Sequence, residues 1–329
     1  MKPLLLAFAV GLGLTAGAAA EEIVIKFSHV TAEAGNPKGE AATLFAERVN
    51  SSPELQGKVR VEVYPNSQLF NDDKVLEAML LGDVQLAAPS LSKFENFTLK
   101  YRVFDLPFMF EDIAAVDRFQ SSPEGQALLD AMSDYGLKGL GYWHNGMKQL
   151  SANRPLVEPS DAEGLKFRIQ TSDVLESQFR ALDANPQKMA FSEVYGALQQ
   201  GVVDGQENTW SNIYTKKFFE VQDGITETNH GIIDYLLVTN ADFWDGLPDD
   251  VRTELDRILA EVTVEANQMS AQLADESRQK VLDAGVEIRQ LTPEQRAAWV
   301  AAVRPVWDEF ADDIGGDVIT AAQSHNRGS

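Results

Sequence analysis

The chain contains no cysteine, and its histidines are few and scattered. Without cysteine there are no disulfides and no thiolate metal sites, so stability must come from packing. The four histidines, His29, His144, His230 and His325, lie far apart, and none stands at metal-ligand spacing from another. We expect them to be hydrogen-bonded structural residues, and we expect neither a metal nor a cofactor.

Several enzyme signatures are also absent. The sequence has no zinc-protease helix, no phosphate-binding glycine loop and no nucleophile elbow. An enzyme acting on carboxylic acids can assemble its site from distant residues, so this class stays open as a remote alternative. It would need a general base with a tuned pKa, and no residue stands out as one.

Long apolar runs are missing except at the N-terminus. Residues 1–3 carry one positive charge, residues 4–15 are mostly apolar, and residues 18–20 are the three alanines of a cleavage site. This pattern predicts a cleavable secretory signal over residues 1–20. No later stretch approaches the roughly twenty apolar residues that a membrane span needs. We therefore expect an exported chain without membrane insertion, most simply in a bacterial periplasm.

Positive charge is scarce. The chain has 28 lysines and arginines against 50 acids, and loss of residues 1–20 removes one lysine, which leaves 27 − 50 = −23. Such a surface repels nucleic acid and anionic lipid, so neither is an expected partner. A site for an anion must therefore concentrate positive charge locally.

Strand and helix patterns alternate along the chain. Strands are predicted over 23–28, 59–64, 85–88, 137–143, 164–170 and 231–239, and helices over 38–49, 72–81, 173–182 and 192–199. This alternation predicts an α/β chain with open, largely parallel sheets. The 329 − 20 = 309 residues that follow the signal suggest two domains.

Residues 248–284 predict one unusually long helix. Val251, Leu255, Ile258 and Val262 recur at helical spacing, and no glycine or proline interrupts the pattern. At about 1.5 Å per residue, this helix exceeds the length of one small domain. We expect it to bridge two domains; two shorter helices are the alternative.

Arg168 is the first candidate for binding a ligand. It lies in the alternating segment 164–170, while Lys148 and Asn208 follow two other predicted strands. A guanidinium fork matches both oxygens of a carboxylate, and a lysine and an amide nearby would complete a clamp. The alternative is a surface arginine on an edge strand.

Several motifs together resemble one family. They are Ile25–His29, Tyr64–Leu69, Phe104–Phe110, Leu165–Arg168, Phe191–Gly205 and Gln206–Asn208. In this order they resemble the extracytoplasmic solute-binding proteins of tripartite ATP-independent periplasmic (TRAP) transporters, over nearly all of the chain after the signal. Residues 143–153 are most similar to the C4-dicarboxylate (DctP-type) group, whereas relatives that bind sialic acid have an arginine where Lys148 stands.

The resemblance implies a two-lobed α/β binding protein with a central cleft and a long helix spanning both lobes. Lobe one would hold 21–144 plus 234–273, and lobe two 145–233 plus 274–329. The implied protein is a monomer without catalytic activity. It would capture a C4-dicarboxylate (malate, succinate or fumarate) and deliver it to the membrane subunits of a TRAP transporter. A 2-oxo acid, a sugar acid or an aromatic acid is the alternative ligand.

The resemblance also assigns roles in the site. Arg168 would pair with one ligand carboxylate, Asn208 would donate an amide hydrogen bond to it, Lys148 would add charge, and Phe191 would form an apolar wall. The alternatives are a turn cap for Asn208, a solvated position for Lys148 and a core position for Phe191.

A second carboxylate needs a partner on the facing lobe. Lys38, at a helix start, is the first candidate and Ser90, at a strand end, is the second. His29 and Trp210 are expected to lie nearby.

Overall fold

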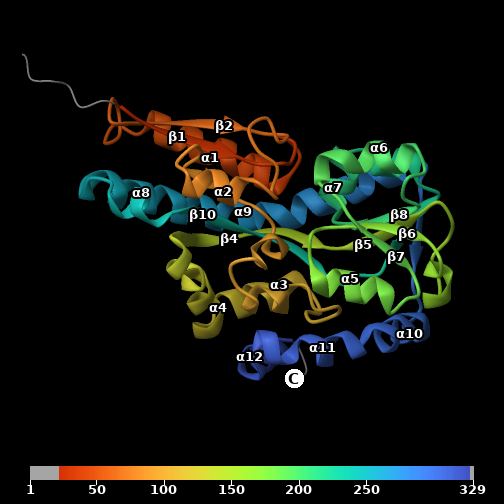
Figure 1. The fold of residues 1–329 in the computed structure, drawn as a ribbon. Helices are drawn as coiled ribbons and strands as arrows, with labels where there is room; N and C mark the ends of the chain where they lie inside the picture. The colour runs from red at the N-terminus through yellow and green to blue at the C-terminus, as the bar shows by residue number, and fades with distance from the viewer. Residues whose placement is uncertain (1–21, 327–329) are drawn as a thin grey trace, which may run out of the picture.

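The protein consists of two α/β lobes side by side, as the computed structural model shows (Figure 1). The structure describes residues 22–326, so the predicted signal over 1–20 lies outside the described residues. The sheet of lobe one has the order β2 (Val59–Tyr64), β1 (Ile23–Ser28), β3 (Leu86–Ala87), β10 (Ile232–Asn240), β4 (Leu137–Met147). The sheet of lobe two has the order β11 (Glu287–Gln290), β9 (Gly224–Glu227), β5 (Gln149–Ala152), β8 (Gly205–Asn208), β6 (Lys166–Ile169), β7 (Asn185–Lys188).

Both sheets are mixed, which corrects the prediction of largely parallel sheets. β1 runs parallel to β2 and β3, and β6 runs parallel to β7 and β8. However, β10 is antiparallel to β3 and β4, and β5 is antiparallel to β8 and β9. The reason is that the chain crosses between the lobes along β4 and β5 and returns along β9 and β10. This outgoing and returning ribbon joins the two sheets.

Helices cover both sheets. Those of lobe one are α1 (Pro37–Ser51), α2 (Val75–Leu80), α3 (Ile113–Gln120), α4 (Pro123–Ala127) and α8 (Ala241–Asp245). Those of lobe two are α5 (Asp173–Arg180), α6 (Val194–Gln199), α7 (Trp210–Thr215) and α10 (Pro293–Val303). α9 (Asp249–Asp283) belongs to both lobes, and α11 (Pro305–Ile314) and α12 (Gly316–Ser324) end the chain.

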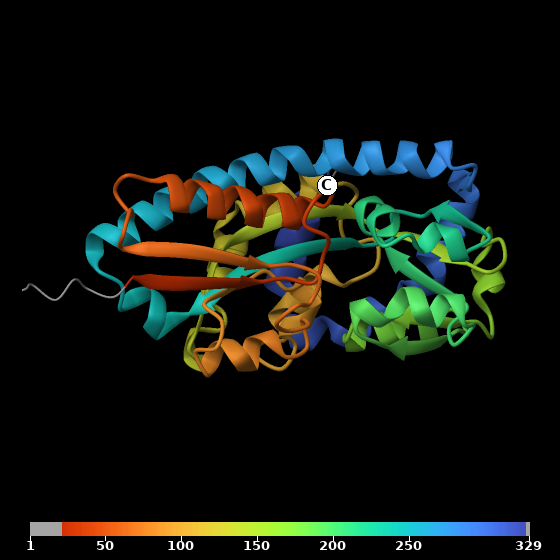
Figure 2. The ribbon, with the colours of Figure 1, turned by 90° about the horizontal axis from the view of Figure 1, so that it is seen from above.

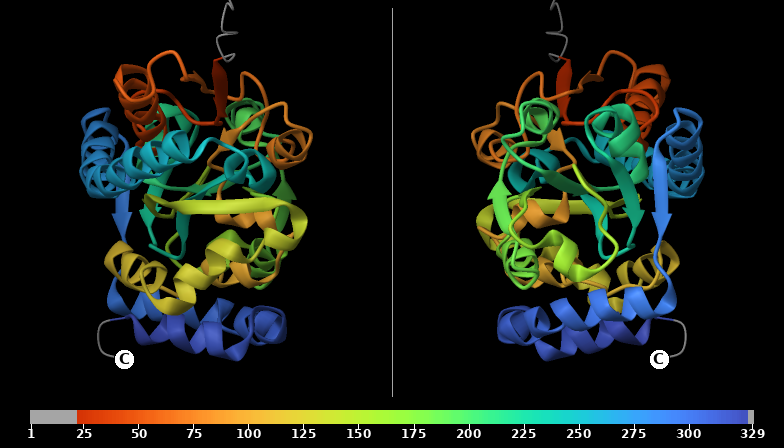
Figure 3. Two further views of the ribbon diagram at one scale, coloured as in Figure 1. Left: turned by 90° about the vertical axis from the view of Figure 1, so that its left-hand side faces the viewer. Right: turned by 90° about the vertical axis from the view of Figure 1, so that its right-hand side faces the viewer.

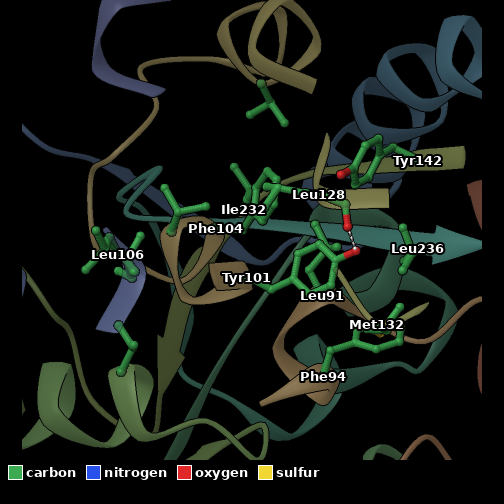
Figure 4. Close-up of a cluster of buried hydrophobic side chains, with 14 of the residues drawn as sticks. Leu91, Phe94, Tyr101, Phe104, Leu106, Leu128, Met132, Tyr142, Ile232 and Leu236 are labelled. Atoms are coloured by element: carbon green, nitrogen blue, oxygen red, sulfur yellow. Dashed lines mark hydrogen bonds between the residues drawn. The ribbon is translucent and has the colours of Figure 1, made fainter. Parts of the chain in front are cut away.

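The aromatic core of lobe one packs between its sheet and the segment 91–137. Figure 4 shows part of it, where the Tyr101 hydroxyl donates to the Leu128 carbonyl oxygen at 2.6 Å. Phe104 lies at the centre of this cluster, with its ring 5.6 Å from that of Phe119 and 6.1 Å from that of Tyr142. Such aromatic packing supplies much of the apolar burial on which a chain without disulfides depends.

The predicted long helix is confirmed as the single 35-residue helix α9. Figure 2 shows it running along the whole length of the molecule, above both lobes. Val251 and Val262 of its first half are buried in the core of lobe one, while Val281 is buried in that of lobe two. At about 1.5 Å per residue it spans about 52 Å, so a single helix packs against both lobes.

The last two helices pack differently from the predicted division, which assigned 274–329 to lobe two. Trp307, Phe310 and Ile314 of α11 share the buried cluster of lobe one with Phe104. The Trp307 indole also donates to the Pro107 carbonyl oxygen at 2.8 Å. Figure 3 shows these blue helices passing beneath the rest of the molecule. An amphipathic helix pattern predicts that one face is buried, but not against which lobe.

His144 ties β4 to β10 close to the crossing between the lobes. It stands opposite Asp234 in the ladder, and its Nδ1 lies 2.7 Å from the Asp234 Oδ2 atom. Its Nε2 lies 3.4 Å from Asp117. Burial alone would lower the pKa of His144, but the two carboxylates raise that pKa to about 10.

The stability that His144 contributes should therefore fade as the pH rises. Because its folded-state pKa of about 10 lies above the ordinary value, the contribution is fully present below the unfolded-state pKa and is lost as the pH rises through the folded one. His144→Gln should cost on the order of a few kcal/mol in the free energy of unfolding at mildly acidic pH. In urea titrations the difference from wild type should shrink between about pH 6 and about pH 9. A difference that stays constant or grows would contradict the charged pair.

Candidate functional site

Arg168 sits inside the sheet of lobe two, not at its edge. β6 lies between β8 and β7, and Arg168 is only 2% exposed. The alternative of a surface arginine on an edge strand is therefore wrong. β8 can pack close to the neighbouring strands β5 and β6 because Gly205 has no side chain. A Cβ at this position would meet the Ser151 carbonyl oxygen of β5 at 2.5 Å and the Phe167 ring of β6 at 2.6 Å. The parallel pairing brings the carboxyl ends of β6 and β8, and with them Arg168 and Asn208, to the same edge.

The Arg168 guanidinium is held by a backbone carbonyl and by no acid. Its Nε and Nη2 donate to the Met189 carbonyl oxygen at 3.0 and 2.8 Å. Among residues 22–326 no carboxylate oxygen lies within 4.0 Å of it, although Glu207 and Asp73 act on it from further away. Burial lowers the pKa of Arg168 to about 10. A desolvated cation without a partner is costly, and an anion beside it would remove that cost.

A cavity opens at this edge, between the lobes. It is small, and residues of both lobes line it. Four of the predicted binding residues line it: Arg168, Asn208, Phe191 and Ser90. The Phe191 ring lies 5.9 Å from the Arg168 guanidinium carbon. Ser90 comes from lobe one, and its hydroxyl donates to the Gln170 side chain of lobe two.

A chain of three asparagines orients the Asn208 amide. The backbone N–H of Lys38 donates to Asn36 Oδ1 at 3.2 Å, which leaves the Asn36 Nδ2 to donate to Asn212 Oδ1 at 2.8 Å. Asn212 in turn donates to Asn208 Oδ1 at 2.7 Å. The side-chain oxygen of each asparagine thus accepts a hydrogen bond, and the Asn208 Nδ2 has no acceptor among the described residues. A backbone donor at the start of α1 therefore aims an amide donor into the cavity.

Lys38 and His29 lie behind the cavity wall. Lys38 is fully buried; its Nζ donates to the Ala88 carbonyl oxygen at 2.8 Å and lies 3.8 Å from the centre of the Tyr235 ring. Burial lowers the pKa of Lys38 to about 8. The His29 Nδ1 atom is 3.1 Å from the hydroxyl of Thr31, which does line the cavity. Burial, and then the nearby Lys38, lower the pKa of His29 to about 3, so this ring is neutral.

Lys148 and Trp210 are likewise outside the cavity wall. The Lys148 Nζ lies 2.8 Å from Glu207, which is also 2.8 Å from the His230 ring. Burial alone would raise the pKa of Glu207, but Lys148 and His230 lower it to about 2. Trp210 begins α7 and faces a separate hollow beside α9, where its ring lies 5.8 Å from the Arg278 guanidinium.

The structure adds wall residues that the sequence did not reveal. They are Val30, Thr31, Asp72, Asp73, Lys93, Gln170, Asn212, Ile233 and Tyr235. The sequence does indicate Gln170, because it lies on the same face of the predicted strand as Arg168. The sequence does not indicate Lys93, because the short turn Leu91–Phe94 that carries it has no periodic pattern.

The arrangement of this site suits an anion. Two unused donors, on Arg168 and Asn208, face the cavity from neighbouring strands. Within residues 22–326 no three acidic or histidine side chains are grouped as metal ligands. None of the helices in that range has the length and apolarity needed to cross a membrane.

The asparagine chain can be tested by cutting its first link. Asn36→Ser keeps an N-cap acceptor for α1 but is too short to reach Asn212, so the Asn208 amide loses its orientation. We expect carboxylate affinity, measured by calorimetry, to fall by about tenfold, the worth of roughly one hydrogen bond. The melting temperature should change little.

The matched control is Asn240→Ser, because Asn240 caps α8 in the same way and lies far from the cavity. It should leave the affinity unchanged. Equal effects of the two variants on affinity would show that the asparagine chain does not orient the site.

Comparisons with known proteins identify the family of the chain. The profile of "Bacterial extracellular solute-binding protein, family 7" matches residues 27–313. The chain is 60% identical to the C4-dicarboxylate-binding periplasmic protein DctP of Vibrio cholerae, over 99% of both chains. A TRAP periplasmic solute-binding protein of Shewanella oneidensis, solved with bound succinate, superposes with a TM-score of 0.91 at 51% identity, over 93% of this chain and 100% of that one. One from Pseudomonas aeruginosa, solved with bound L-malate, has a TM-score of 0.84 at 47% identity, over 87% and 99%. The chain therefore belongs to family 7 of the bacterial extracellular solute-binding proteins.

Proposed function

We propose that the protein captures a C4-dicarboxylate, such as succinate, malate or fumarate, in the periplasm and delivers it to the membrane subunits of a TRAP transporter. The observation that carries this proposal is Arg168, a buried guanidinium that faces an interlobe cavity without a protein carboxylate. A relative named for C4-dicarboxylate binding and two solved with bound succinate or L-malate support it. It assigns the protein no catalytic step.

The charges around the cavity favour an anion. Arg168 and Lys93 line it, Lys38 lies behind Tyr235, and the Lys216 Nζ lies 5.4 Å from the centre of the Phe191 ring. Asp72 and Asp73 are the acids of the wall. Glu207 and Glu193 also act on Arg168, and Lys148 pairs with Glu207, so five cations and four acids leave a formal charge of 5 − 4 = +1 around the cavity. On a chain with a net charge of −22, this local excess is specific to the site.

The lobes are in contact around the cavity. Polar side chains join them through Asn36–Asn212 at 2.8 Å, Lys216–Asn66 at 2.8 Å, Arg102–Asp173 at 2.9 Å and Lys93–Thr171 at 3.2 Å. These contacts belong to the closed form of a hinged binding protein. We propose that a ligand held by lobe two draws lobe one onto it, and that the membrane subunits recognise this closed form.

The remaining sequence-based assignments stay proposals. Residues 1–20 would be a signal cleaved on export. Asn208 would donate to the carboxylate held by Arg168, Phe191 would cover the ligand methylenes, and Ser90 would act from the facing lobe. Lys38 and Lys148 would act through their charge, with His29 and Trp210 as supports of the wall. The lobes would divide as predicted except for α11 and α12.

Arg168 should increase ligand affinity and lower the stability of the ligand-free protein. Arg168→Met removes both the charge that a carboxylate needs and the cost of burying it. We expect succinate affinity to fall by roughly 2–5 kcal/mol, while the ligand-free protein melts at the same temperature or higher. Arg168→Lys should recover part of the affinity, because it restores the charge but not the fork.

Arg180→Met is the matched control, because this arginine of α5 is exposed and paired with Glu176 on the same helix. Calorimetry should find its affinity unchanged. Near-normal succinate binding by Arg168→Met would remove Arg168 from the site.

Both carboxylates of the ligand should matter. Butyrate has the length of succinate but would leave one cation of the site without a ligand carboxylate, a loss of about 1–3 kcal/mol. Succinate and malate should therefore bind at least tenfold more tightly than butyrate, by about that energy, and neutral sugars should not bind. If butyrate matched succinate, or a bulky monocarboxylate bound best, the C4-dicarboxylate assignment would fall.

A further inference from the structure

The facing lobe must supply a cation for the second carboxylate of a dianion, and Lys38 is poorly placed for it. Its ammonium already donates to the Ala88 carbonyl oxygen, stacks on the Tyr235 ring and lies 4.0 Å from Asp72. It is absent from the cavity wall. Tyr235 stands between Lys38 and the cavity, so Lys38 contributes charge but no direct contact.

Lys93 is the lysine that lines the cavity, alone of its type among residues 22–326. It projects from the short turn Leu91–Phe94 of lobe one, opposite the sheet that carries Arg168. Its side chain is 5% exposed, so its ammonium is largely desolvated. Lys93 and Arg168 are thus the two cations in direct contact with the cavity, one from each lobe.

The Lys93 ammonium is held in place by both lobes. Its Nζ lies 2.6 Å from Asp73 Oδ1 and 3.2 Å from the Thr171 hydroxyl, which itself donates to Asp73 at 2.9 Å. Burial alone would raise the pKa of Asp73, but Lys93 lowers it, so the pair is ionic. An ammonium has three donors, and these two contacts leave one for a ligand. Asp73 and Thr171 therefore hold Lys93 between the cavity, which Asp73 and Lys93 line, and a neighbouring hollow that all three residues line.

We propose that Lys93 binds the distal carboxylate of the ligand, opposite Arg168, and thereby sets the preference for two carboxylates over one. This rests on the proposed function. It also separates two contributions to affinity. Arg168 and Asn208 bind the first carboxylate of any ligand in lobe two. Lys93, on lobe one, adds affinity only when the ligand has a second carboxylate.

The test is the ratio of succinate to butyrate affinity, measured by calorimetry at neutral pH on the full mature chain. Lys93→Met should weaken succinate binding at least about tenfold and butyrate binding by less than about threefold, since butyrate has no second carboxylate to lose. The ratio should therefore collapse. Lys93→Gln, which can still donate to Asp73, is the second variant should the first not fold.

Two controls separate recognition from closure. Thr171→Val removes the contact across the lobes but keeps the charge, so it should weaken both ligands by the same factor and leave the ratio intact. Lys138→Met removes an exposed lysine of β4 paired with Asp245, far from the cavity, and should change neither affinity.

The outcomes distinguish the two proposals. If the wild type binds butyrate as tightly as succinate, the dicarboxylate function itself falls. If the wild type prefers succinate and both Lys93 variants keep that ratio, only the role of Lys93 is overturned. Loss of the ratio in Lys38→Met, with the Lys93 variants unchanged, would return the distal carboxylate to Lys38.

Discussion

A positive charge buried without a protein carboxylate is the constraint on which the rest of this structure depends. The Arg168 guanidinium is 2% exposed and is satisfied by one backbone carbonyl oxygen. Its burial costs free energy in the empty protein, and the surrounding sheet must be stable enough to hold it. Gly205 allows the neighbouring strand to approach closely, so both β6 and β8 deliver their carboxyl ends to the cavity. Under the proposed function, this cost would turn into binding free energy when a carboxylate binds beside Arg168.

The polar groups around this charge form an ordered network. The asparagine chain begins at a backbone N–H of α1 and ends at the Asn208 amide, so lobe one helps to orient a donor in lobe two. Arg102 joins the lobes at a second point through Asp173 of lobe two at 2.9 Å, and it also pairs with Asp313 of α11 at 2.6 Å. Because these partners are partly exposed, each ion pair contributes modestly, which suits the opening and closing that the proposed function requires.

The crossing segments determine how the lobes can move. The ribbon of β4, β5, β9 and β10 passes through both sheets, and α9 runs beside both lobes. A rotation of one lobe against the other must therefore be absorbed within these few elements. The buried pair of His144 and Asp234 joins β4 to β10 within this ribbon on the side of lobe one.

The sequence by itself determined the α/β class, the long helix and the pairing of an arginine with an amide at strand ends. These depend on short-range periodicity and on residue type, which local order along the chain preserves. Only the tertiary structure decided that the sheets are mixed, that α11 packs on lobe one and that Lys93, not Lys38, touches the cavity. Strand direction depends on how distant segments pair. Likewise, a lysine side chain is long enough to face either a cavity or the core, and packing around it decides which.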